Sequence, residues 1–180
     1  MLPKVLAAVA AFAGLLMMHP DRAVAADQAQ TVYVMRHLQK TAGEDPRLTE
    51  EGAILAEMVA GMFGGKDFGI KAAFATKTRR AMQTGEPLAR FIGVPVTPYD
   101  PRNVPALVAA VKAVPGNVLV VGHSNTVPDL VAAFGGTKPA PIPETDYGTI
   151  YQVTSGSPTV REFFVPPPPI PLAPAPERSR

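Results

Sequence analysis

The chain has 180 residues, and its hydrophobic fraction of 47% is enough for one domain with a buried core rather than a disordered chain. The formal net charge is only +2, and Lys and Arg are scattered, so the sequence lacks the basic stripe of a nucleic-acid-binding protein and we expect no such partner. Cysteine is absent, which excludes disulfides, thiolate catalysis and zinc–cysteine sites.

The first 26 residues have the pattern of a secretory signal peptide. Lys4 precedes an apolar run from Val5 to Met18, and small residues at 23–26 offer a cleavage site after Ala25 or Ala26. The alternative is a membrane anchor, but the run is shorter than the roughly 20 residues that a spanning helix needs. We therefore expect a periplasmic or secreted protein with no membrane attachment after cleavage.

A short apolar run, Thr31 to Met35, predicts a buried strand, because β-branched and aromatic residues fit a pleated core surface. Arg36 and His37 follow directly. The polar stretch 38–47 contains Gly and Pro and predicts a loop. A helix is then expected from Thr49, its N-cap, to the glycines at 64 and 65.

Strands and helices alternate through the middle of the chain. We expect a strand over 70–75, a helix over 81–92 closed by Gly93, a proline-interrupted edge strand over 94–99, and a helix from Asn103 or Val104 to about Val114. A second buried strand follows at 117–121 and leads through Gly122 into His123 and Ser124. A short helix over 128–134, an irregular loop over 135–143 and a hairpin of strands 149–154 and 159–165 complete the pattern.

This alternation predicts a single α/β domain over 27–165, a three-layer α/β/α sandwich with a mostly parallel central sheet. The carboxyl ends of parallel strands share one edge, where ligands bind. His37 and His123 should therefore meet there, and two histidines with arginines suggest a phosphoryl-transfer site. Residues 166–180 hold seven of the 21 prolines and predict an extended, disordered tail.

Three motifs occur in order at the ends of predicted elements: Arg36-His37, Arg80-Ala81-Met82-Gln83-Thr84 and Gly122-His123-Ser124. Together they resemble the histidine phosphatase superfamily, which has the phosphoglycerate mutase-like fold, and within it the small exported SixA-like branch. The resemblance runs from about Thr31 to Val165. It includes the segment Asp45-Pro46-Arg47-Leu48-Thr49 with Gly52.

The resemblance implies a catalytic role for each matching residue. His37 would be the nucleophile that becomes phosphohistidine. Arg36 and Arg80 would bind the phosphoryl oxygens through their planar guanidinium groups, and His123 would donate to the same oxygens. Neither a metal nor another cofactor is expected. Arg79, beside Arg80, is expected on a solvated face.

Two positions leave alternatives open. Lys40 follows Leu38 and Gln39, where many family members begin with glycine, and it is either a further substrate-binding charge or an ordinary exposed lysine. The general acid that protonates the leaving group is assigned to Asp100, just after the third strand, although Asp before Pro is also a common turn former. Glu144 and Asp146 are the other carboxylates considered for this role.

The predicted activity is hydrolysis of a phosphorylated small molecule or of phosphohistidine on a protein. The mutases of the family carry an insertion after the third strand, whereas here only 100–104 separates that strand from the next helix. The alternative function is an exported phosphate-binding or interaction protein with a retained but inactive pocket. The sequence leaves the oligomeric state open.

Overall fold

The structure is a computed structural model that describes residues 29–165. The predicted signal peptide, 1–26, and the predicted proline-rich tail, 166–180, lie outside the described residues. No helix within 29–165 combines the length and the apolar character that crossing a bilayer requires.

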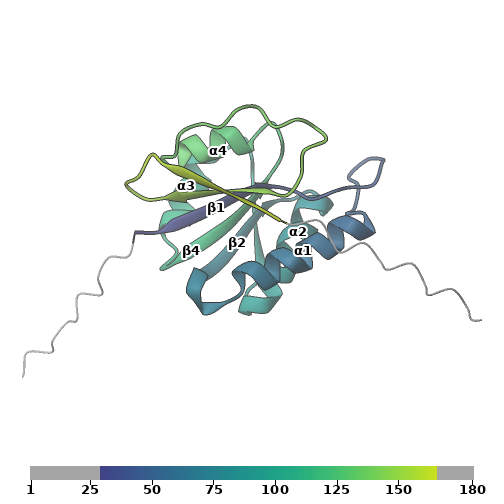
Figure 1. Cartoon of the computed structure of the whole chain (residues 1–180), viewed down its shortest axis with the longest axis horizontal. Helices are drawn as coiled ribbons and strands as arrows, with labels where there is room; N and C mark the ends of the chain where they lie inside the picture. The colour runs from purple at the N-terminus through teal and green to yellow at the C-terminus, as the bar shows by residue number, and fades with distance from the viewer. Residues whose placement is uncertain (1–28, 166–180) are drawn as a thin grey trace, which may run out of the picture.

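The elements alternate between strand and helix, as the sequence predicts (Figure 1). In chain order they are β1 (Thr31–Arg36), α1 (Glu50–Phe63), the 3-10 helix η1 (Lys66–Phe68), β2 (Ile70–Thr76), α2 (Arg79–Ile92), β3 (Val96–Tyr99), α3 (Val104–Lys112), β4 (Asn117–Gly122), α4 (Val127–Ala133), β5 (Thr149–Thr154) and β6 (Val160–Phe164).

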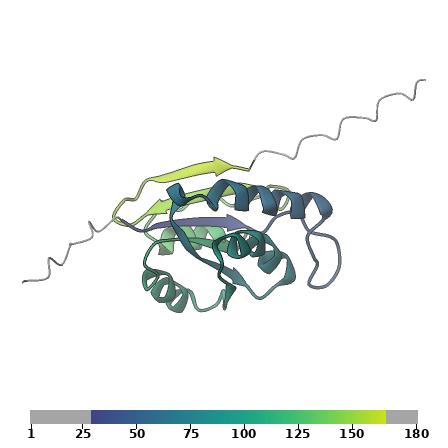
Figure 2. The same cartoon turned by 90° about the horizontal axis from the view of Figure 1, so that it is seen from below.

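The strands of the described residues form one sheet in the order β3-β2-β4-β1-β5-β6. β3, β2, β4 and β1 run parallel to one another. β5 pairs with β1 in antiparallel fashion, and β6 pairs with β5 in antiparallel fashion. β3 lies at one edge, as its proline predicts. The hairpin of β5 and β6 forms the other edge and is drawn in yellow-green in Figure 2.

Successive residues of β1 face opposite sides of the sheet and supply two separate hydrophobic clusters. Tyr33 and Met35 pack with residues of α1 and α2 on one face. Val32 and Val34 pack with residues of α3 and α4 on the other. In Figure 1, accordingly, α1 and α2 lie together on one side of the sheet and α3 and α4 on the other. The predicted three-layer α/β/α sandwich with a mostly parallel sheet is confirmed.

Helix α1 begins as predicted, because the Thr49 hydroxyl accepts a hydrogen bond from the Gly52 N–H at 3.0 Å. Three other boundaries differ from the prediction by two residues. β3 begins at Val96 rather than at residue 94. α2 begins at Arg79 rather than at residue 81, and the Arg79 N–H donates to the Asp45 carboxylate at 2.8 Å. α3 ends at Lys112 rather than near Val114, because a residue that precedes proline is disfavoured in helical conformation.

Candidate active site

The pairing of β1 with β4 brings the two predicted histidines together. Arg36 lies opposite Gly122 in the parallel register, so the next residues, His37 and His123, emerge side by side at the carboxyl edge of the sheet. The His37 N–H donates to the Gly122 carbonyl at 3.0 Å. The centroids of the two imidazole rings are 5.3 Å apart, and their planes are inclined by 66°.

The surroundings of His37 keep its imidazole neutral. Nδ1 lies 2.8 Å from the carbonyl oxygen of Leu38, which can only accept, so Nδ1 carries the proton and Nε2 keeps its lone pair. The residue is 2% exposed. Burial lowers the pKa of His37 to about 4, and the charges of Arg80 and Arg36 act in the same direction, against the bond to Leu38. At neutral pH the side chain is therefore uncharged, and Nε2 has the lone pair that a nitrogen nucleophile needs.

His123 is held between β2 and α2. Its Nδ1 lies 3.5 Å from Nη2 of Arg80, and its Nε2 lies 2.8 Å from the hydroxyl of Thr76. Because a guanidinium can only donate, Nδ1 is the acceptor and Nε2 carries the proton. Burial lowers the pKa of His123 to about 4, and the charges of Arg80 and Arg36 add to this effect.

Arg80 lies in the first turn of α2 and is tied to the end of β1 by Thr84. The Thr84 hydroxyl accepts from the Leu38 N–H at 3.1 Å and donates to the Arg80 carbonyl at 2.8 Å. Nε of Arg80 is buried and has no hydrogen-bond partner among the described residues. Arg79, in contrast, is exposed, as the sequence predicts.

Arg36 is almost completely buried, with an exposed fraction of 3%. Its Nη1 donates to two carbonyl oxygens, those of Pro143 at 2.8 Å and Asp146 at 2.9 Å. Its Nη2 donates to the Glu144 carboxylate at 2.6 Å and lies 3.4 Å from the Tyr147 hydroxyl. The guanidinium carbon also lies 4.2 Å from the centre of the Tyr147 ring. As in Arg80, Nε of Arg36 is buried and has no partner within residues 29–165.

Several solved phosphatase structures are similar to this one. The protein histidine phosphatase SixA, in complex with tungstate, gives a TM-score of 0.57 at 24% sequence identity, with 75% of this chain and 95% of SixA covered. A mycobacterial glucosyl-3-phosphoglycerate phosphatase gives a TM-score of 0.60 at 15% identity, with 76% of this chain and 98% of that chain covered. YhfR of Bacillus stearothermophilus gives a TM-score of 0.58 at 17% identity, with 76% of this chain and 96% of YhfR covered. No protein-family model and no curated protein sequence matches the chain.

The chain has the histidine phosphatase fold. The resemblance inferred from the motifs is therefore confirmed at the level of architecture, including the phosphoglycerate mutase-like order of strands and helices. These identities, all below 25%, establish the fold and leave the activity to be argued from the side chains.

In this histidine phosphatase fold, the loop before β5 reaches across the end of β1. We define the segment 143–147 as the Arg36 clamp, because its carbonyls and side chains account for the five contacts of the guanidinium described above. Glu144 and Asp146 were expected only as candidate acids, and their contacts with Arg36 could not be predicted, since residues 135–148 show no hydrophobic periodicity. Glu144 also accepts a hydrogen bond from the Ser124 hydroxyl, and this bond and the charge of Arg36 lower the pKa of Glu144.

The predicted general acid, Asp100, lies at the rim of the site. It lines a cavity of about 520 Å³ together with Arg80, Tyr99 and His123. Its exposed carboxylate accepts hydrogen bonds from the N–H, Nε and Nη2 of Arg102 at 2.9, 3.1 and 3.2 Å. These bonds lower the pKa of Asp100, whereas a general acid benefits from a raised pKa. Its geometry is that of the turn former considered as the alternative, and its catalytic role stays a prediction.

Lys40 is half-buried and lies at the base of the 41–47 loop, where it forms a β-bridge with Leu48. Its charge is not among those that shift the pKa of His37 or His123. The structure therefore brings together Arg36, His37, Arg80 and His123, with Asp100 at the rim, and it shows no link between Lys40 and this group.

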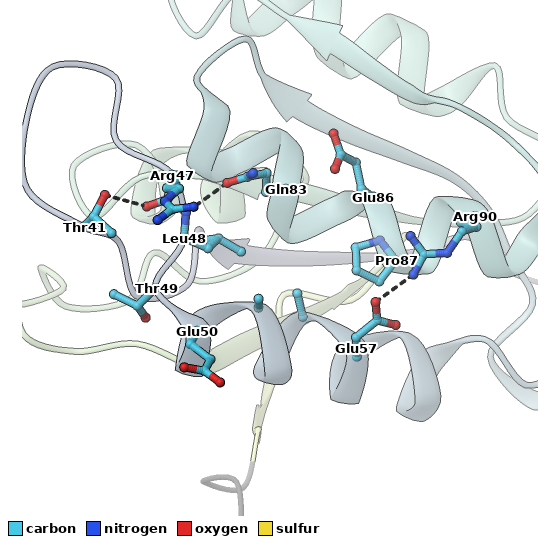
Figure 3. Close-up of a pocket in the computed structure, with 12 residues that line it drawn as sticks. Thr41, Arg47, Leu48, Thr49, Glu50, Glu57, Gln83, Glu86, Pro87 and Arg90 are labelled. Carbon is cyan, nitrogen blue, oxygen red and sulfur yellow. Dashed lines mark hydrogen bonds and ion pairs between the residues drawn. The ribbon is translucent and has the colours of Figure 1, made fainter.

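A second cavity, of about 410 Å³, lies between α1 and α2 (Figure 3), and neither histidine lines it. Arg90 pairs with Glu57 across it at 2.7 Å. Gln83 accepts a hydrogen bond from the Leu48 N–H at 2.9 Å and so anchors the 41–47 loop to α2. Within 29–165, no group of three or more His, Asp or Glu side chains is placed to hold a metal ion.

Proposed function

We propose that the protein is a phosphatase that works without a metal ion, hydrolysing phosphomonoesters or phosphohistidine through a phosphohistidine intermediate on His37. One observation carries the proposal. A neutral histidine with a free Nε2 lies close to two arginines, Arg36 and Arg80, and each arginine has a buried Nε–H without a partner among the described residues. An unpartnered buried donor is costly, and a phosphoryl oxygen supplies the missing acceptor.

The chemistry proceeds in two displacements. His37 Nε2 forms a bond to phosphorus as the bond from phosphorus to the leaving group breaks. Water then attacks the phosphohistidine, releasing inorganic phosphate and restoring the imidazole. Arg36 and Arg80 stabilise the charge on the phosphoryl oxygens in both steps, and His123 joins them when its Nε2–H turns from the Thr76 hydroxyl to a phosphoryl oxygen.

The choice of hydrolysis over mutase chemistry is supported by the short link between β3 and α3. Only residues 100–103 connect the two elements, so no insertion encloses the cavity beside His123 and water can reach the intermediate. The structural likeness to SixA, a protein histidine phosphatase, and to a glucosyl-3-phosphoglycerate phosphatase supports both substrate classes.

The test is turnover of p-nitrophenyl phosphate in the presence of EDTA. We expect wild-type protein to be active and to carry acid-labile, base-stable phosphate when the reaction is quenched. His37→Ala should lose both the activity and the label. Label that persists in His37→Ala would exclude His37 as the nucleophile. Tungstate binding without turnover would favour the alternative, a phosphate-binding or interaction protein.

We propose export as well, from the signal-like pattern of the first 26 residues. Cleavage after Ala25 or Ala26 should appear in the intact mass of protein recovered from outside the cytoplasm. Retention of Met1 would contradict cleavage and favour a membrane anchor.

A further inference from the structure

Arg36 can bind an oxyanion through only one edge of its guanidinium group. A bidentate grip needs two neighbouring N–H groups that point the same way. Nη1 is committed to the carbonyls of Pro143 and Asp146, and these are main-chain atoms that no side-chain movement can remove. The free edge is the one that Nε and Nη2 share.

Glu144 binds Nη2, one of the two donor nitrogens of that edge. One of its carboxylate oxygens accepts from Nη2 of Arg36 at 2.6 Å, and the other accepts from the Ser124 hydroxyl. The carboxylate thus spans the ends of β1 and β4, where His37 and His123 emerge. Its charge lies close enough to His123 to oppose the lowering of that pKa. A phosphoryl group gripped by Nε and Nη2 would have to take its place.

The two partners differ greatly in exposure. The Arg36 side chain is 3% exposed, whereas the Glu144 side chain is 76% exposed. The arginine is therefore fixed in the protein, and the glutamate can rotate into water at little cost. An incoming anion should therefore displace the carboxylate of Glu144 and leave the guanidinium of Arg36 in place.

We propose that Glu144 is an internal competitor for the phosphoryl-binding edge of Arg36, so that every anion must displace its carboxylate before Arg36 binds in bidentate fashion. This inference rests on the proposed function and adds a control on affinity to the same site. Because only the fraction of molecules with Glu144 displaced is competent, the apparent dissociation constant is raised by the inverse of that fraction. The factor is the same for every ligand that uses this edge.

The experiment measures binding of tungstate and of inorganic phosphate to the full chain by calorimetry. Glu144→Gln replaces the charged hydrogen bond to Arg36 with a neutral one, so the competitor is weaker. The dissociation constants of tungstate and phosphate should both fall by the same factor, roughly tenfold. Glu144→Ala should give at least this gain, because alanine cannot contact Arg36 at all. Glu162→Gln, an exposed site on β6, removes the same charge and should change both constants by less than about twofold.

Kinetics give an independent readout. Removal of the competitor should lower the KM for p-nitrophenyl phosphate and the inhibition constant of phosphate together, whereas loss of a general acid would lower kcat. Unchanged or weaker tungstate binding in both Glu144 variants, with their thermal unfolding intact, would overturn the inference alone. Failure of wild type and both variants to bind either anion would overturn the proposed function, and this inference with it.

Discussion

The hydroxyl of Thr84 accepts a hydrogen bond from the main-chain N–H of Leu38 across 3.1 Å. This bond joins the residue after the proposed nucleophile to the helix that carries Arg80, and Thr84 itself is fully buried. The Thr84 oxygen is therefore a direct polar link between the segment that carries His37 and the helix that carries Arg80.

Thr84→Val tests this dependence. Valine fills the same volume but leaves the buried Leu38 N–H without an acceptor, which should lower the free energy of unfolding by about 1–3 kcal/mol. Activity should fall as well, because the end of β1 is no longer fixed to α2. Thr84→Ser keeps the hydroxyl and should retain most activity. Equal activity in the Val and Ser variants would show that the bond does not position the site.

Arg80 and Arg79 form a matched pair for testing phosphoryl binding. Arg80→Lys keeps the charge but loses the planar fork, so kcat/KM should fall roughly 10- to 100-fold, the equivalent of one or two charged hydrogen bonds. Arg79→Lys changes an exposed side chain and should leave kcat/KM within about twofold. Similar losses in the two variants would contradict the assignment of Arg80. Measuring kcat/KM for p-nitrophenyl phosphate with both proteins decides the question.

The lowered pKa values of the two histidines predict a pH-dependent stability. Both fall from 6.5 to about 4 in the folded protein, so below pH 6.5 the unfolded chain binds protons that the folded chain does not. The free energy of unfolding should therefore decrease as the pH is lowered from about 6.5 to 4, by up to about 3 kcal/mol for His37. The pKa values of Asp100 and Glu144 are also lowered, but these two carboxylates change the free energy of unfolding mainly below this pH range.

Urea unfolding at pH 7 and pH 4.5 measures the change. Proton NMR of the imidazole rings, assigned with His37→Asn and His123→Asn, should give midpoints near 4 for both residues. A midpoint near 6.5 for His37 would mean that its ring is solvated and would contradict the burial seen in the structure.

Asp100→Asn tests the general acid. Because Arg102 lowers the pKa of Asp100, we expect the variant to keep similar activity on alkyl phosphates and on nitrophenyl phosphate, with asparagine preserving the turn. If Asp100 does protonate the leaving oxygen, alkyl phosphates should lose about 10²- to 10⁴-fold while nitrophenyl phosphate, whose leaving group is stable without a proton, loses far less. The ratio of kcat/KM for the two substrates separates these outcomes. A selective loss on alkyl phosphates would confirm Asp100 as the general acid.

Local sequence patterns were enough to predict the order of the strands and helices. Local patterns specify backbone conformation and burial, so the capping of α1 by Thr49, the edge position of β3 and the β5–β6 hairpin could all be predicted. The meeting of His37 and His123 followed as well, because parallel strands place their carboxyl ends on one side of the sheet. The motifs also led to the histidine phosphatase fold, which the structural comparisons confirm.

The partners of the side chains in the site could be identified only in the folded chain. The bond from Thr76 to His123, the contact of Asp45 with the start of α2, and the Arg36 clamp all join residues that are distant in the chain. Such pairs depend on strand order and on the path of loops that have no repeating pattern. A hydrogen bond between distant residues depends on where the folded chain places both ends, and local sequence preferences determine only each end separately.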